Sequence, residues 1–262
     1  MSVVIHPASV VSSKASLGDG VTIGPFCLVE DDVVIGANTE LMSHVVVANG
    51  ARIGADCRLH PGAVIATEPQ DLKFKNEPTT AVIGDRTVIR ECVTVNRGTT
   101  ASGTTVVGSD CLIMAYAHVA HDCRVGDRVV IANSVQMGGH TEIGDWAVIG
   151  GNSAIHQFTK IGAHAMIGGA ARVVKDIPPF VLAGREPIQI EALNKIGLKR
   201  RGFSADLIDE IDRFYDVLFR QGYNMTDGMA AYEAATATII PEVQACIDFV
   251  RGSKRGIARP SR

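Results

Sequence analysis

The chain has 262 residues, and its 25 Lys and Arg nearly balance its 28 Asp and Glu, giving a net charge of −3 at pH 7. This balance argues against the basic surface that electrostatic binding to nucleic acid requires. No apolar run approaches the roughly 18 residues of a membrane span. Residues Met1–Ser2 lead directly into a repeat, without the basic and apolar segments of a secretory signal. We therefore expect a cytoplasmic protein with no transmembrane segment and no nucleic-acid partner.

A large aliphatic residue recurs at every sixth position from Ile5 to Val173, with interruptions at about 66–82 and 96–105. A small residue often stands two positions earlier and a glycine one position later, as in Val21-Thr-Ile23-Gly24. Helices repeat at three and four residues and half-buried strands at two, so neither explains this period. A fixed short period predicts a solenoid whose stacked coils bury columns of like side chains. We expect the glycines to supply positive φ at the corners.

The repeat ends at Val173, and Pro178 and Pro179 oppose continuation of a strand or helix. A helical pattern follows, with Ser204 as its predicted N-cap and an end near Gly222. Pro241 is placed to open a last helix. We predict a repeat domain over 1–184 and a helical domain over 185–262. The two interruptions are either loops that carry function on a rigid scaffold or tolerated surface insertions.

Four of the six cysteines occupy the small inward position of the repeat, where other coils have Ala, Val or Thr. These are Cys27, Cys57, Cys111 and Cys123. No C-x-x-C pair occurs, which gives no support for a metal site or a redox motif. We predict that these four are small buried residues and that the protein holds no metal.

Two histidines lie close together in the segment Ala117-His-Val-Ala-His-Asp-Cys123. Because Val119 and Cys123 take the inward positions, His118 and His121 project outward or lie at a corner. Coil stacking brings His140 close to this pair. A single outward His is usually only solvated, but a group of them beside a carboxylate suits proton transfer near neutral pH.

Several segments resemble the UDP-N-acetylglucosamine O-acyltransferases of lipid A biosynthesis, a family within the hexapeptide-repeat acyltransferases. The matching segments are Ser43-His-Val-Val-Val47, Gln70-Asp-Leu-Lys73, His118-Val-Ala-His-Asp-Cys123, His156-Gln-Phe158 and Gly197-Leu-Lys-Arg-Arg-Gly-Phe203. The resemblance implies a mainly β fold: a left-handed parallel β-helix with three faces and a C-terminal α-helical domain. The left hand comes from the resemblance alone, since ordinary parallel crossovers are right-handed.

The resemblance also implies an activity: transfer of a 3-hydroxyacyl chain from acyl carrier protein to the 3-hydroxyl of UDP-N-acetylglucosamine, the first step of lipid A biosynthesis. It implies a homotrimer with sites between neighbouring copies, and no cofactor beyond the phosphopantetheine of the donor. His121 would be the general base, Asp122 would orient it, and the Gly139 N–H would stabilise the oxyanion. Gly169 would leave the acyl groove open to a long chain, unless it is only a corner glycine. The substrate-binding residues implied are Gln70, Asp71, Lys73, His118, His140, His156, Gln157, Asn194, Arg200 and Arg201.

The sequence leaves some alternatives open. Arg200 and Arg201 could simply complete the end of a helix, and Ile196 stands where the family often has an acidic residue. Another hexapeptide-repeat acyltransferase, or a 3-amino acceptor sugar, fits the repeat equally well. A zinc-dependent γ-type carbonic anhydrase would need two histidines five residues apart, whereas His118 and His121 are three apart.

Overall fold

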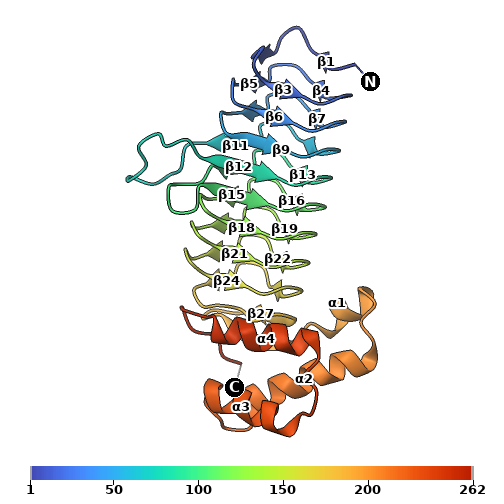
Figure 1. The fold of residues 1–262 in the computed structure, drawn as a ribbon, viewed down its shortest axis with the longest axis vertical. Helices are drawn as coiled ribbons and strands as arrows, with labels where there is room; N and C mark the ends of the chain where they lie inside the picture. The colour runs from blue at the N-terminus through green and yellow to red at the C-terminus, as the bar shows by residue number, and fades with distance from the viewer. Residues whose placement is uncertain (1, 261–262) are drawn as a thin grey trace.

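The computed structural model describes residues 2–260, which form a three-sided prism of stacked coils closed at one end by helices (Figure 1). In the regular coils the chain returns to the same face after eighteen residues, so that Val4 pairs with Thr22 and Ile5 with Ile23. Through the stacked coils each face is a parallel sheet, because every coil crosses it in the same direction. The six-residue period of the sequence is therefore one face per repeat, as predicted.

The three sheets are built from very short strands, each hydrogen-bonded to the strands of the coils before and after it. The first sheet contains, in pairing order, β1 (Val4–Ile5), β4 (Thr22–Ile23), β7 (Glu40–Leu41), β10 (Arg58–Leu59), β13 (Val88–Ile89), β16 (Leu112–Ile113), β19 (Val130–Ile131), β22 (Val148–Ile149), β25 (Met166–Ile167), β27 (Val181–Gly184) and β28 (Gln189–Leu193). The second contains β2 (Val10–Val11), β5 (Leu28–Val29), β8 (Val46–Val47), β11 (Val64–Thr67), β14 (Thr94–Asn96), β17 (His118–Val119), β20 (Gln136–Met137), β23 (Ala154–Ile155) and β26 (Arg172–Val173). The third contains β24 (Lys160–Ile161), β21 (Glu142–Ile143), β18 (Arg124–Val125), β15 (Thr104–Val107), β12 (Thr80–Ile83), β9 (Ala51–Ile53), β6 (Val34–Ile35) and β3 (Ser16–Leu17).

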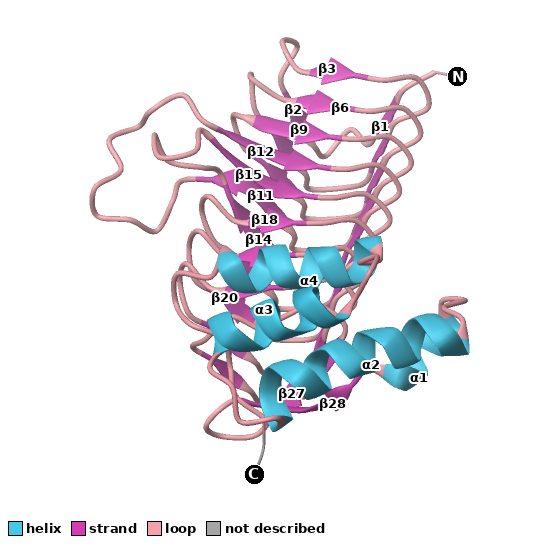
Figure 2. Cartoon of the chain, turned by 60° about the horizontal axis from the view of Figure 1, so that its bottom comes forward, coloured by secondary structure: helices cyan, strands magenta, loops and turns pink. Residues whose placement is uncertain are grey.

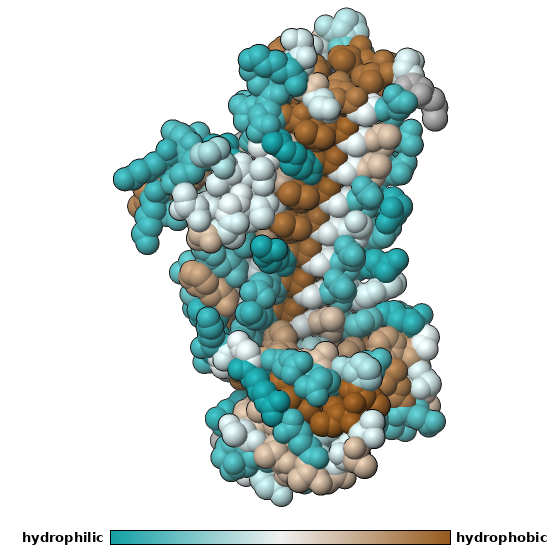
Figure 3. All heavy atoms as spheres, viewed as in Figure 1, coloured by the Kyte–Doolittle hydropathy of each residue, from teal (hydrophilic) through white to brown (hydrophobic). Residues whose placement is uncertain are grey.

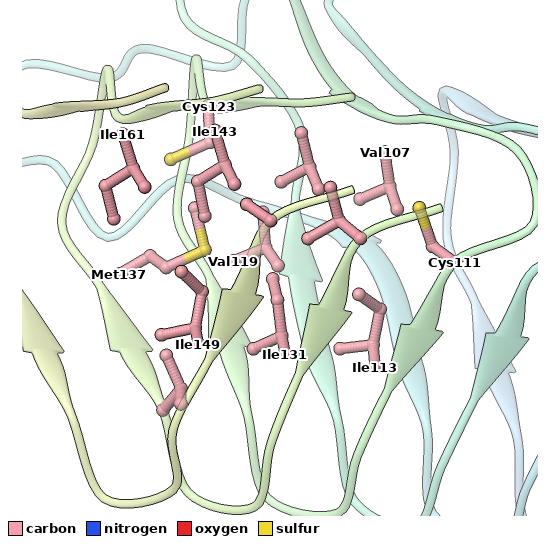
Figure 4. Close-up of a cluster of buried hydrophobic side chains, with 14 of the residues drawn as sticks. Val107, Cys111, Ile113, Val119, Cys123, Ile131, Met137, Ile143, Ile149 and Ile161 are labelled. Carbon is pink, nitrogen blue, oxygen red and sulfur yellow. The ribbon is translucent and has the colours of Figure 1, made fainter. Parts of the chain in front are cut away.

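The interior of the prism is a set of aliphatic columns, in which each inward residue lies over its counterpart in the next coil (Figure 4). Ile113, Ile131 and Ile149 form one such column and are fully buried. The aliphatic strand residues also appear as an apolar stripe along the prism (Figure 3). Cys27, Cys57, Cys111 and Cys123 are buried and free, as predicted, and each thiol donates to a carbonyl oxygen of the next coil.

The prediction about the glycines was wrong. The glycines that follow the large residues do not have positive φ; that conformation falls mostly on other residues of the corners, such as Asn38, Asp56 and Trp146. The glycines are needed because successive coils are close. A Cβ built on Gly36 would lie 2.5 Å from the carbonyl carbon of Gly54, and one on Gly144 would lie 2.5 Å from the nitrogen of Ala163. Any side chain there would push adjacent coils apart.

Both interruptions of the repeat leave the prism at the corner between the second and third sheets. Residues 68–79 join β11 to β12 and form the long loop that projects sideways in Figure 1. Residues 97–103 join β14 to β15 and form a shorter loop beneath it. Arg97 connects the two, because its guanidinium lies 5.1 Å from the ring centroid of Phe74 and donates to the Ala66 carbonyl.

The C-terminal part packs four helices against the lower end of the prism (Figure 2). They are α1 (Lys195–Arg200), α2 (Ala205–Arg220), α3 (Met225–Ala235) and α4 (Pro241–Arg251). Ser204 caps α2 by accepting from the Leu207 N–H, and Pro241 opens α4, both as predicted. The helices α1 and α3 and the antiparallel pairing of β27 with β28 were not predicted.

The predicted domain boundary at 184/185 falls in the turn between β27 and β28, so the first sheet extends past it by one strand. Among residues 2–260, no helix combines the length and apolar character needed to cross a membrane.

Candidate active site

The candidate base and its carboxylate partner lie at the corner that also carries both loops. His118 points outward from β17, Val119 points inward, and the chain then turns through Ala120, His121 and Asp122 before β18. Asp122 has φ +60°, and its side chain is completely buried. The inward pattern of Val119 and Cys123 therefore placed the two histidines correctly, one on an outer face and one at a corner.

The carboxylate of Asp122 is held by four donors. Its Oδ1 accepts from the Thr99 N–H at 3.0 Å and from the Ser102 hydroxyl. Its Oδ2 accepts from the Thr99 hydroxyl at 2.7 Å and from Nδ1 of His121 at 2.8 Å. Burial by itself raises the pKa of a carboxyl, but the bonds from Ser102, His121 and Thr99 outweigh it and lower the pKa of Asp122 to about 2. Asp122 is therefore ionised at neutral pH.

The partner of this carboxylate, His121, has its ring fixed from two sides. Because Nδ1 donates to Asp122, the neutral imidazole carries its proton there and leaves the lone pair of Nε2 free. The ring lies over the backbone of Gly139, where a built Cβ would come within 2.5 Å of Cε1 and 2.7 Å of Nε2. Only glycine fits at that position. Among residues 2–260, no acceptor takes the N–H of Gly139.

Two further histidines surround this pair. The ring of His140 meets that of His121 edge-on at a centroid distance of 5.3 Å, and Phe158 stacks on its other side at 4.5 Å. Nδ1 of His118 lies 2.7 Å from the Thr94 hydroxyl. Burial, and then the nearby His121, lower the pKa of His118, so its imidazole is neutral at pH 7.

The other predicted substrate-binding residues of the prism lie on the long loop and after β23. Gln70, Asp71 and Lys73 are on the long loop, where the Asp71 carboxylate accepts from the Lys73 N–H. His156 and Gln157 are exposed after β23, and Nδ1 of His156 donates to the carbonyl of Gln157.

The substrate-binding residues predicted near α1 divide into two groups. Asn194 is buried: its carbonyl oxygen accepts from the Gly197 N–H, capping α1, and its amide donates to the His164 carbonyl. Arg201 also faces inward, with its guanidinium 5.3 Å from the ring centroid of Trp146 and donating to Nδ1 of His164 at 3.3 Å. Burial, and then Arg201, lower the pKa of His164 to about 4 and leave it a neutral acceptor.

The remaining residues of this region are exposed. Arg200 lies on the surface of α1, and Ile196, which stands where the family often has an acidic residue, is 69% exposed. Gly169 is exposed at the corner that leads from the first sheet to the second, next to Gly151.

The cluster of His121, Asp122 and His140 brings three metal-ligating groups together. A carboxylate has about four lone-pair positions, and on Asp122 the four donors fill them. A cation would have to displace at least one of these donors. The arrangement therefore suits a charge partner of an imidazole better than a metal ligand.

The residues that complete this site were not predicted individually. Thr94, Thr99, Ser102 and Phe158 make contacts with the histidines and with Asp122. The one signal for Thr99 and Ser102 was their position in the second interruption of the repeat.

Comparison with known proteins agrees with this geometry. Residues 176–258 match the family described as Udp N-acetylglucosamine O-acyltransferase, domain 2, and residues 32–67 and 104–139 match the bacterial transferase hexapeptide repeats. An acyl-[acyl-carrier-protein]--UDP-N-acetylglucosamine O-acyltransferase of Thermodesulfovibrio yellowstonii is 42% identical over 256 residues, which cover 97% of this chain and 99% of that protein. The chain belongs to this acyltransferase family.

Solved structures of the family confirm the fold. The UDP-N-acetylglucosamine acyltransferase of Bacteroides fragilis is 44% identical and superposes with a TM-score of 0.95, covering 97% of this chain and all of that one. The Acinetobacter baumannii protein is 38% identical, with a TM-score of 0.94 over 98% of this chain and all of that one. The prism is thus a left-handed parallel β-helix, and the predicted fold class and family are both confirmed.

Proposed function

We propose that this protein transfers a 3-hydroxyacyl chain from acyl carrier protein to the 3-hydroxyl of UDP-N-acetylglucosamine, the first step of lipid A biosynthesis. The observation that carries the proposal is the pair of His121 and Asp122 at a loop-bearing corner, with Nε2 of His121 free and the backbone of Gly139 against the ring. Membership of the acyltransferase family supplies the substrate class.

The geometry supports a general-base mechanism. Nε2 of His121 takes the proton of the sugar hydroxyl as its oxygen attacks the thioester carbonyl, and the ionised Asp122 stabilises the imidazolium that forms. The tetrahedral oxyanion accepts from the unused N–H of Gly139. The intermediate then collapses, the carbon–sulfur bond breaks, and the imidazolium returns its proton to the leaving thiolate. Every proton and charge is accounted for without a metal or cofactor.

The surroundings of the base suit a sugar. His118 and His140 border His121 and offer ring nitrogens to hydroxyl groups. Phe158, which is 52% exposed, backs His140 with an apolar ring. Arg200 on α1 and Lys73 on the long loop are exposed cations available to a diphosphate, and Asn194 and Arg201 act by holding α1 against the prism.

A homotrimer would complete the site. The outward positions of the first sheet from β13 to β25 are all apolar: Val88, Leu112, Val130, Val148 and Met166. The aligned positions of the third sheet are charged in its lower part, with Arg124, Glu142 and Lys160. An apolar column on one face of a prism suits burial against another copy.

The long loop supports the same assembly. Leu72 in this loop is fully exposed, between Asp71 and Lys73, and the loop projects away from the prism (Figure 1). In a trimer it would reach a neighbouring copy and bring Gln70, Asp71 and Lys73 to that copy's substrate. We propose a cytoplasmic location for this chain.

Replacing His121 with Ala tests the mechanism. We expect turnover of 3-hydroxyacyl carrier protein with UDP-N-acetylglucosamine to fall by roughly 10²–10⁴-fold, the usual contribution of a general base. The matched control is His6→Ala, which removes an exposed imidazole at the far end of the prism and should keep full activity. Circular dichroism and size-exclusion chromatography check the fold and assembly. Near-normal turnover of the His121 variant would refute the mechanism.

A further inference from the structure

The short loop 97–103 has no role in the proposed chemical steps, yet it makes most of the contacts to Asp122. Thr99 is buried, and both its N–H and its hydroxyl donate to the carboxylate, one to each oxygen. Ser102 donates to Oδ1 as well. The loop itself is closed by the Gly103 N–H, which donates to the Thr99 carbonyl at 2.7 Å. The insertion therefore folds into a compact turn around one side chain.

The number of hydrogen-bond donors around the Asp122 carboxylate fixes its orientation. A carboxylate offers about four lone-pair positions, and the loop fills three of them. The one that remains, on Oδ2, faces His121. The carboxylate cannot rotate about its Cβ–Cγ bond without breaking loop contacts, so the direction in which it accepts from Nδ1 is fixed.

The backbone is held as well as the side chain. The N–H of Asp122 donates to the Thr105 hydroxyl at 2.8 Å, just beyond the loop. Asp122 thus occupies its positive-φ corner with its main chain and its carboxylate both anchored to the preceding coil. Such anchoring is needed wherever a reacting group must keep its direction to within about 10–20°.

We propose that Thr99 and Ser102 are positioning residues for acyl transfer: they orient the Asp122 carboxylate so that it holds His121 with its proton on Nδ1 and Nε2 free. This inference rests on the proposed role of His121 as base. It gives the second interruption of the repeat a function, which is to aim a carboxylate that lies one coil later.

The test compares three substitutions by steady-state kinetics with UDP-N-acetylglucosamine and a 3-hydroxyacyl carrier protein. Thr99→Val keeps the shape and removes the hydroxyl, and we expect kcat to fall roughly 10-fold or more with the KM for the sugar nucleotide within about twofold. Thr99→Ser restores the hydroxyl and should recover most of the kcat. Thr80→Val is the matched control, because the Thr80 hydroxyl donates to Thr104 at the base of the same loop and does not contact Asp122.

A double-mutant cycle decides whether Thr99 acts through Asp122. In an Asp122→Asn background, Thr99→Val should cause no further loss. An equal loss in both backgrounds would overturn the inference, as would a Thr99→Val variant with normal kcat. If Thr99→Val does not fold, as judged by thermal unfolding, Ser102→Ala is used in the same cycle on the other oxygen. Failure of the base proposal is distinguishable, because His121→Ala and Asp122→Asn would then both keep normal turnover.

Discussion

At the scale of single residues, the site depends on the contacts that hold the Asp122 carboxylate and the His121 ring in place. The pair of His121 and Asp122 could be predicted, since an imidazole next to a carboxylate is visible in the sequence. The support of that pair could not, because Thr99 is 23 positions from Asp122 and the hydrogen bonds exist only once the coils stack. Gly139 was predicted as an oxyanion donor. The structure gives a separate reason for glycine at this position, because the ring of His121 lies where a side chain would be.

Gly169→Met tests the predicted control of acyl-chain length. A Cβ at Gly169 would meet nothing closer than the Gly151 carbonyl oxygen, at 3.3 Å, so a side chain can be accommodated with a small adjustment and would extend into the open corner. We expect the preference to move to shorter 3-hydroxyacyl donors, with the sugar nucleotide KM unchanged. Competition among carrier proteins of graded chain length measures it. An unaltered length preference would show that Gly169 is only a corner glycine.

At the scale of secondary-structure elements, the regular strands were predictable and their connections to the helices were not. Each strand repeats the same contact at the same spacing, so its signal accumulates along the sequence. The helix α1 is six residues long and is positioned by contacts with a distant corner, through Asn194 and Arg201 to His164. A sequence pattern cannot show a contact that is made once, between residues 30 or more positions apart.

Asn194→Ala tests this connection. The substitution removes the cap of α1 and leaves the His164 carbonyl without its donor, and we expect the free energy of unfolding to fall by about 1–2 kcal/mol. Asn224→Ala is the matched control, since Asn224 caps α3 by the same bond and is exposed; it should cost about 1 kcal/mol or less. Urea unfolding measures both. Unchanged stability with a raised KM for the sugar nucleotide would instead support direct substrate binding by Asn194.

At the scale of the whole molecule, the prism is uneven around its axis. The part of the third sheet nearest the helices carries charged outward residues and adjoins α4. Asp248 and Phe249 of α4 border a groove of about 460 Å³ between this helix and the sheet. The first sheet carries the apolar column, and the corner opposite it carries both loops and the base. The period of six predicted the prism but did not show which face is apolar and which is charged. That distinction appears only when the outward residues are compared one sheet at a time.

Leu112→Glu tests the assembly. A charge in the middle of the apolar column should prevent close packing of a second copy, so we expect a monomer by light scattering. Because the monomer lacks the binding contacts supplied by the neighbouring copy, turnover should fall by roughly 100-fold or more. Val34→Glu is the control, because Val34 is an outward residue of the third sheet and is 41% exposed. A Leu112 variant that remains trimeric and active would exclude this face as the interface.

The close contact between coils at the glycine column has one further consequence, for selectivity. Strands in a sheet are spaced by about 4.8 Å, which is about the length of four methylene groups, and the glycines allow the coils to stack this closely. A side chain that blocks the acyl groove can therefore lie at the level of Gly169 or one whole coil away, at the equivalent position Gly151. Donor preference in this scaffold should change in discrete jumps of several carbons, and fine adjustment within a jump is left to the volume of the blocking side chain.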